Sequence, residues 1–117
     1  MQHITLYHNP RCSKSRQALA LLQSQPVDVQ VILYLKQPPT KAQLQHLLQL
    51  ANCPVRDIMR NQDALYRQLE LDNPALSDSE LIDVLTEQPI LLQRPIAHTA
   101  DRAIVARPPE TVMELLS

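Results

Sequence analysis

The cysteine at position 12 lies in a positively charged stretch of the chain. Arg11, Lys14 and Arg16 surround it, and no carboxylate occurs before Asp28. The thiolate is the reactive form of cysteine, and neighbouring cations lower the pKa of a thiol. A helix is predicted to begin directly after Cys12, which adds unpaired backbone N–H groups and the positive end of the helix dipole. The residue types and their spacing therefore predict a nucleophilic cysteine.

The helix alone is not sufficient to ionise such a thiol at neutral pH. A free thiol has a pKa of about 8.5, and lowering it to roughly 6.5 requires about 2.7 kcal/mol of selective thiolate stabilisation. A helix N-terminus contributes about 0.3–1 kcal/mol, and about 2 kcal/mol in favourable geometry. We expect nearby cations and hydroxyl donors such as Ser15 to supply the rest, with His8 adding to the field if it lies close and is protonated. The alternative is that Cys12 is a small buried residue after a turn.

Ser15 stands where a Cys-x-x-Cys redox pair would have its second cysteine. The dithiol of thioredoxin is thus missing, and an enzyme built on Cys12 would need an external thiol to complete a redox cycle. The other cysteine, Cys53, precedes a helix-opening proline and is interpreted as a structural residue. It could act as a resolving partner only if the fold brings it close to Cys12.

The residues around Cys12 form a predicted strand–helix–strand unit. Residues 3–7 alternate in polarity and precede a turn at Asn9–Pro10, which indicates a strand followed by a loop. Apolar residues recur at helical spacing from Ser13 to Ser24. The run from Val29 to Leu35 is mainly apolar and is followed by two prolines, so we predict a buried parallel strand there.

Helices are predicted through the middle of the chain. Two of them begin with a capping box, in which two side chains three residues apart bond each other's backbone N–H groups. The four predicted helices run from Thr40 to Ala51, from Pro54 to about Arg60, from Ala64 to Leu71 and from Ser77 to Gln88.

Two short strands, 96–98 and 103–106, and a last helix opened by Pro109 complete the predicted elements. In this helix Val112, Leu115 and Leu116 share one face. The order β-α-β, helices, β-β-α is that of an α/β thioredoxin/glutaredoxin-like fold, with a mixed sheet and helices packed on it. We predict a single domain over residues 1–117 with a helical insertion at about 40–90.

Composition excludes several other classes of protein. The 117 residues contain no glycine, so neither a Walker loop nor a dinucleotide-binding fingerprint is present. The net charge of −1 gives no indication of nucleic-acid or membrane binding. The four histidines show no zinc-site spacing, and we expect no metal. Without a recognisable signal peptide, we expect a cytoplasmic protein.

The motif Tyr-His-Asn-Pro-x-Cys-x-x-Ser-Arg at 7–16 resembles the signature of the glutaredoxin-dependent arsenate reductase family, which is often called ArsC-like. The resemblance covers nearly the whole chain. It continues through Tyr34-Leu35, Pro38-Pro39-Thr40, Arg56, Arg60, Leu81-Ile82-Asp83, Gln88-Pro89-Ile90-Leu91, Gln93-Arg94-Pro95-Ile96 and Arg107-Pro108.

This resemblance implies a site and a reaction. Cys12 would attack arsenate to form a covalent thiol–arsenate adduct, which glutathione would displace before glutaredoxin completes reduction to arsenite. It implies oxyanion-binding roles for three arginines, thiolate-tuning roles for three residues near Cys12, and a cis Arg94–Pro95 bond. The arginines are Arg60, Arg94 and Arg107, and the tuning residues are His8, Ser15 and Arg16. No tightly bound cofactor is implied; glutathione would be a co-substrate, and we expect a monomer.

Two other functions stay open at this point. One is a glutathione-dependent thiol reductase that acts on a substrate other than arsenate. The other is a non-enzyme similar to the Spx-type regulators, which bind RNA polymerase and sense oxidation. Those sensors commonly use a Cys-x-x-Cys switch, and Ser15 removes it here.

Overall fold

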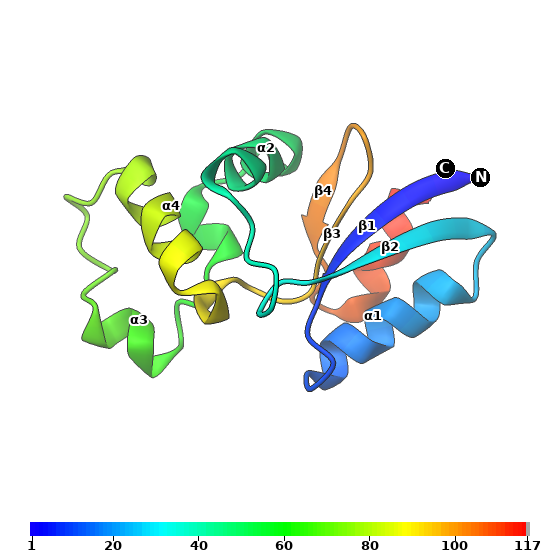
Figure 1. Cartoon of the computed structure of the whole chain (residues 1–117), viewed down its shortest axis with the longest axis horizontal. Coiled ribbons are helices and arrows are strands. Elements are labelled where there is room, and N and C mark those ends of the chain that lie inside the picture. The colour runs from blue at the N-terminus through cyan, green and yellow to red at the C-terminus, as the bar shows by residue number, and fades with distance from the viewer. Residues whose placement is uncertain (117) are drawn as a thin grey trace. The chain divides into compact units, whose positions relative to one another are not determined.

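The computed structural model describes residues 1–116, so Ser117, the last residue of the predicted domain, lies outside the described part. The chain forms two compact units (Figure 1). One consists of Met1–Gln37 together with the chain from Arg94 onward, and the other of Pro38–Gln93. The single-domain organisation stays a prediction, and each unit is described by itself.

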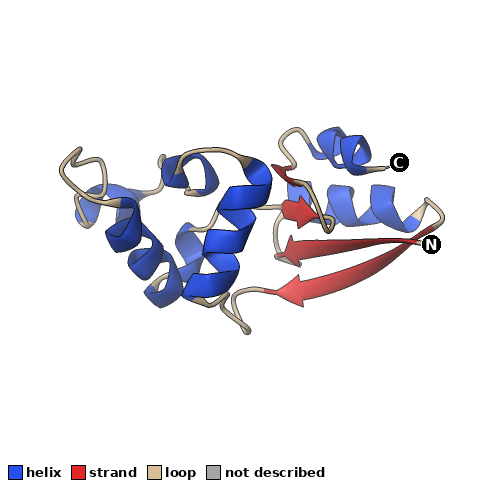
Figure 2. Cartoon of the chain, turned by 90° about the horizontal axis from the view of Figure 1, so that it is seen from above, coloured by secondary structure: helices blue, strands red, loops and turns tan. Residues whose placement is uncertain are grey.

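The first unit contains a mixed four-stranded sheet. Its strands are drawn in red in Figure 2. The strands lie in the order β2-β1-β3-β4; β1 pairs parallel with β2 and antiparallel with β3, which pairs antiparallel with β4. Their bounds are Gln2–His8 for β1, Val27–Leu33 for β2, Ile96–His98 for β3 and Ala103–Val105 for β4. The predicted α/β fold class with a mixed sheet is confirmed.

The second strand differs from the prediction in position and in burial. It spans Val27–Leu33 rather than Val29–Leu35, because β1 offers partners only as far as Leu33. The chain then turns, and the N–H groups of Lys36 and Gln37 both donate to the Leu33 carbonyl at 2.9 and 2.8 Å. The prediction of a buried strand was wrong. β2 is an edge strand with one neighbour, and its Val31 is 38% exposed.

The core of this unit lies between the sheet and two helices. Helix α1 (Ser13–Gln23) and the 3-10 helix η3 (Pro109–Leu115) contact each other and share one apolar cluster with β1 (Figure 1). The buried members of the cluster are Ile4, Leu6, Ala18, Leu22, Ala97, Ala106, Val112 and Leu115. Because β1 is central and its last five residues are all buried, the end of β1 holds the start of the next loop firmly.

The second unit is helical. Both predicted capping boxes are present, with Thr40 preceding α2 and Ser77 preceding α4. The elements are α2 (Lys41–Ala51), η1 (Val55–Ile58), α3 (Ala64–Gln68), α4 (Asp78–Glu87) and η2 (Pro89–Leu91). Helix α3 ends earlier than predicted because Glu70 adopts a positive φ of 55° and the N–H of Leu71 donates back to Tyr66.

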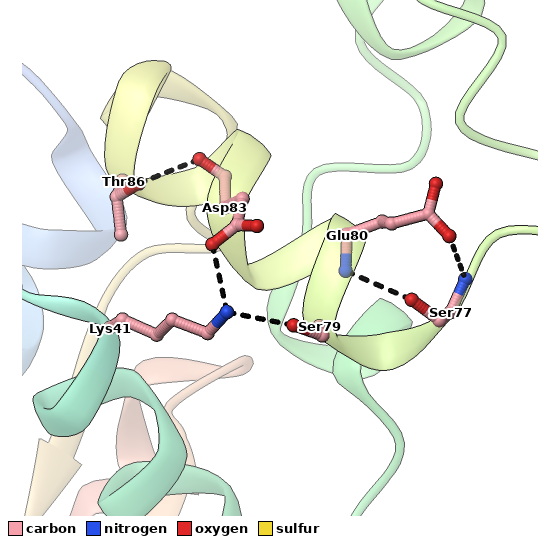
Figure 3. A network of polar contacts seen from close by, with 6 residues as sticks. All are labelled: Lys41, Ser77, Ser79, Glu80, Asp83 and Thr86. Atoms are coloured by element: carbon pink, nitrogen blue, oxygen red, sulfur yellow. Dashed lines mark hydrogen bonds and ion pairs between the residues drawn. The ribbon is translucent and has the colours of Figure 1, made fainter.

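A polar network links the first residue of α2 to α4 (Figure 3). The Nζ atom of Lys41 lies 3.1 Å from the Asp83 carboxylate and donates to the Ser79 hydroxyl at 2.7 Å. These side chains are partly exposed, so the ion pair contributes about 1 kcal/mol or less. The network orients the two helices, while buried residues such as Leu44, Leu47, Leu81 and Leu85 supply most of the stabilisation.

Candidate active site around Cys12

Cys12 is the N-cap residue of α1, directly after the loop that leaves β1. The loop is a tight turn in which the Cys12 N–H donates to the Asn9 carbonyl at 3.0 Å. The Cys12 carbonyl in turn accepts from the Arg16 N–H at 3.0 Å, which is the first bond of the helix. The side chain is partly exposed and forms no disulfide. The predicted position of the thiol at a helix start is therefore confirmed.

The pKa of the Cys12 thiol lies below its ordinary value. Burial acts to raise the pKa, but the backbone N–H of Ser15, the Arg94 side chain and the backbone N–H of Lys14 together outweigh burial. The sulfur makes no regular capping hydrogen bond, so these N–H groups act mainly as dipoles directed at the thiolate. The combination of helix N-terminus and cation favours the nucleophilic form.

Arg94 is the cation that acts on this thiolate. Its side chain is half-buried and interacts with both Cys12 and Tyr34. Burial acts to lower the pKa of Arg94, but the interaction with Cys12 outweighs it, so the pKa is raised and the guanidinium stays charged. The Arg94–Pro95 peptide bond is cis, as the resemblance implied, and Arg107–Pro108 is also cis.

Tyr34 is a site residue that reasoning from chemistry had not selected. It follows β2, its side chain is fully buried, and it interacts with Arg94. A buried phenol normally needs a polar partner. A tyrosine inside an apolar run of the sequence was therefore the feature that could have pointed to a polar contact here. Tyr34 fixes the guanidinium that faces the cysteine.

His8, Asn9 and Ser15 form a buried polar group behind the loop. The Ser15 hydroxyl accepts the Asn9 N–H at 3.0 Å and lies 2.6 Å from His8 Nδ1. Burial, followed by the positive charge of Arg16, lowers the pKa of His8, which favours the neutral ring. His8 was expected to add to the positive field only if it is protonated, and the lowered pKa disfavours that state. The charge comes from Arg94, which lies far away in the sequence.

Arg16 and Arg107 each donate a hydrogen bond to a backbone carbonyl of the first unit. The Arg16 guanidinium donates to the Pro10 carbonyl at 2.8 Å and thereby braces the loop. Arg107 is exposed, and its guanidinium donates to the Arg94 carbonyl at 2.9 Å. Arg107 is thus bonded to the backbone of Arg94, and the Arg94 side chain acts on Cys12.

Arg60 belongs to the second unit, and its predicted role in oxyanion binding stays a prediction. Its N–H donates to the Leu91 carbonyl at 2.7 Å, and its guanidinium lies 3.4 Å from the Asp63 carboxylate. The hydrogen bond fixes the Arg60 backbone and the ion pair orients its side chain. The exposed surface of its guanidinium can still accept a ligand.

Cys53 also lies in the second unit, and its environment is the opposite of that of Cys12. Burial, followed by the negative charge of Asp57, raises the pKa of the Cys53 thiol. The thiol form is thus favoured at neutral pH, which makes Cys53 a poor nucleophile. The pKa values of the two thiols thus shift in opposite directions: the helix N-terminus and Arg94 lower that of Cys12, whereas burial, followed by Asp57, raises that of Cys53.

Within residues 1–116, no cluster of three or more histidine, cysteine or carboxylate side chains could hold a metal ion. Over the same range, no helix has both the length and the apolar character needed to cross a bilayer. The chemistry available at this site is that of a thiolate, hydrogen-bond donors and arginines.

Comparison with known proteins places this arrangement in one family. The family model described as "ArsC family" matches residues 7–115. A protein named arsenate reductase from Haemophilus influenzae is 43% identical, covering 97% of this chain and 98% of the relative. Another of that name, from Neisseria meningitidis serogroup A, is 40% identical over 99% of this chain and 100% of the relative. A solved structure described as arsenate reductase from Vibrio cholerae superposes with a TM-score of 0.95 at 42% identity, covering 98% of each chain. The chain belongs to the ArsC family.

Proposed function

We propose that this protein is an arsenate reductase in which Cys12 is the nucleophile and glutathione and glutaredoxin supply the electrons. The observation that carries the proposal is the position of Cys12 as the N-cap of α1, where the Arg94 side chain acts on its sulfur. A thiolate held by a guanidinium is also a place where an oxyanion finds donors. Arginine suits tetrahedral oxyanions because its planar group can form two parallel hydrogen bonds.

The first step joins sulfur to arsenic. The Cys12 thiolate attacks the arsenic(V) atom, an S–As bond forms, and one arsenate oxygen leaves as water after protonation. The helix N–H groups and Arg94 would stabilise the negative charge of the remaining oxygens. We include Arg107 and Arg60 as further ligands of those oxygens. His8, Ser15 and Arg16 have the role of holding the loop that orients the thiolate.

Reduction of arsenic(V) to arsenic(III) in the remaining steps needs two electrons. Oxidation of two thiols to one disulfide supplies them. Glutathione attacks the arsenic atom, forms a new S–As bond and releases the Cys12 thiolate. A glutaredoxin thiolate then attacks the glutathione sulfur, and the electron pair of the S–As bond stays on arsenic as arsenite. The products are arsenite, water and a mixed disulfide of glutaredoxin and glutathione, so Cys12 returns unchanged.

A coupled assay tests this proposal. NADPH oxidation is followed with arsenate, glutathione, glutathione reductase and glutaredoxin, using the wild type, Cys12→Ser and Cys53→Ser. We expect activity in the wild type and in Cys53→Ser, and none above background in Cys12→Ser. Wild-type turnover no greater than that of Cys12→Ser would contradict the proposal.

The electron donor is tested by substitution in the same assay. Replacing glutathione and glutaredoxin by thioredoxin and its reductase should abolish turnover, because the chain has no Cys-x-x-Cys pair to form an internal disulfide with Cys12. Full activity with thioredoxin would leave arsenate reduction standing but would show that the glutathione step is wrong.

A further inference from the structure

A pocket of about 320 Å³ lies beside the Cys12 loop, at the carboxyl ends of the two parallel strands. His8 and Leu33, which are register partners at the ends of β1 and β2, lie on its wall. Pro10 and Leu35 add apolar surface, and the loop and the turn after β2 contribute Arg11 and Lys36. Ligands of α/β proteins commonly bind at the carboxyl ends of parallel strands.

The two cations of this pocket have no acidic partner. Neither Arg11 nor Lys36 forms an ion pair with any carboxylate within residues 1–116, and both are exposed. They are also not among the groups that lower the pKa of Cys12. The oxyanion chemistry at the sulfur therefore does not account for them.

We propose that this pocket binds the thiol co-substrate, with Arg11 and Lys36 holding the carboxylates of glutathione. This inference rests on the proposed function. Glutathione carries two carboxylates and one ammonium group on a chain of amides and methylenes, so its two carboxylates and its net negative charge match two cations on a partly apolar wall. Arsenate fits this wall less well, because a small hydrated oxyanion gains nothing from Leu33, Leu35 and Pro10.

The dimensions are also consistent with glutathione. The volume lies within the range of about 300–1,000 Å³ that is typical of small-molecule sites and exceeds the space that one oxyanion occupies. An extended tripeptide spans about 10 Å, and Cys12 is the residue next to Arg11, about 3.8 Å away along the backbone. A ligand held by Arg11 can thus bring its thiol to the sulfur–arsenic adduct.

The test is an NMR titration of the full chain with S-methylglutathione, whose blocked sulfur cannot reduce anything. We expect shifts centred on the backbone amides of Arg11, Leu35 and Lys36. Arg11→Gln and Lys36→Gln should each weaken binding about threefold, and the double variant about tenfold, as for partly exposed charge pairs. Arg67→Gln is the matched control: Arg67 is exposed and does not line the pocket, so its loss should leave the Kd unchanged.

Two further ligands separate glutathione binding from general anion binding. The dimethyl ester of S-methylglutathione lacks both carboxylates and should bind at least tenfold more weakly, with no further loss in the double variant. Arsenate should bind the double variant and the wild type equally. The proposal is overturned if the double variant and the wild type bind S-methylglutathione with the same Kd. It is also overturned if the double variant binds arsenate more weakly than the wild type does.

Failure of this inference can be told apart from failure of the proposed function. If arsenate turnover depends on Cys12 but S-methylglutathione shifts other residues, only the pocket assignment is wrong. If S-methylglutathione binds at Arg11 and Lys36 but no arsenate is reduced, the pocket assignment stands and the substrate is wrong. The alkylation rate of Cys12 should be the same in the wild type and the double variant, which checks that the thiolate is intact.

Discussion

The Nδ1 atom of His8 lies 2.6 Å from the Oγ atom of Ser15, and both side chains are buried behind the loop that carries Cys12. The same hydroxyl accepts the N–H of Asn9, so one serine satisfies two buried polar groups. The loop is thus held from inside, while Arg94 acts on the sulfur from the other end of the sequence.

Replacing Ser15 by alanine should destabilise the protein. The substitution leaves His8 Nδ1 and the Asn9 N–H without their partner in a buried site, which costs about 1–3 kcal/mol in the free energy of unfolding. Urea unfolding measures it. The matched control is Ser13→Ala, because Ser13 is exposed on the same helix. Equal unfolding midpoints for the two variants would show that the Ser15 hydroxyl does not hold the loop.

The neutral state of His8 makes stability depend on pH. Burial, followed by Arg16, holds its pKa in the folded state below 6.5, so the unfolded chain takes up a proton that the folded chain does not. The free energy of unfolding should therefore fall as the pH drops through 6.5, and His8→Gln should lose part of this dependence. Urea unfolding at pH 7.5 and 5.5 measures this change in the free energy of unfolding. The control is His46→Gln, because His46 is exposed on α2. A dependence that is the same in His8→Gln and in the wild type would contradict the burial of a neutral ring.

Arg94 should set the reactivity of Cys12. Arg94→Gln removes the guanidinium that acts on the sulfur together with its charge, so the pKa of the thiol should rise and alkylation at pH 7 should slow. Arg94→Lys should restore only part of the effect, because lysine keeps the charge but not the planar group. The pH dependence of the iodoacetamide reaction, measured in a Cys53→Ser background, reports this pKa. Arg102→Gln, which removes a cation elsewhere in the same unit, should react like its parent. An Arg94→Gln profile identical to that of the parent would exclude Arg94 as the partner of the thiolate.

The capping boxes should matter for the helical unit. Thr40→Ala removes the side chain that accepts the Gln43 N–H at 3.1 Å, and we expect the free energy of unfolding to fall by about 1 kcal/mol. Gln45→Ala, on the exposed side of α2, should change it by less than about 0.5 kcal/mol. Thermal unfolding followed by circular dichroism compares the two. An equal effect of both substitutions would argue against a working cap.

Much of the fold could be predicted because its signals are local. The capping boxes at Thr40 and Ser77 are defined by residues three apart, and the structure forms both. The position of Cys12 before α1 likewise follows from the turn at Asn9 and the apolar spacing behind it. Burial of β2 was predicted wrongly because an apolar run indicates a strand but not how many neighbours it has in the sheet.

The electrostatics of the site depended on contacts that local patterns do not contain. Arg94 and Tyr34 meet because the chain returns to the sheet after a separate helical unit, and no spacing rule connects them. The charges near Cys12 in the sequence suggested the right chemistry, but the charge that lowers its pKa belongs to Arg94. The charge state of His8 stayed open at the level of the sequence, because burial cannot be inferred from a loop motif.

The central claim is that the Cys12 thiolate reduces arsenate, and the most direct test is to measure the product itself. Arsenite is quantified chromatographically after incubation of the protein with arsenate, glutathione and glutaredoxin, using the wild type, Cys53→Ser and Cys12→Ser. We predict arsenite in excess of the protein concentration for the first two, and none above the protein-free background for Cys12→Ser. Arsenite formation that persists in Cys12→Ser, or that is absent from the wild type, would contradict the claim.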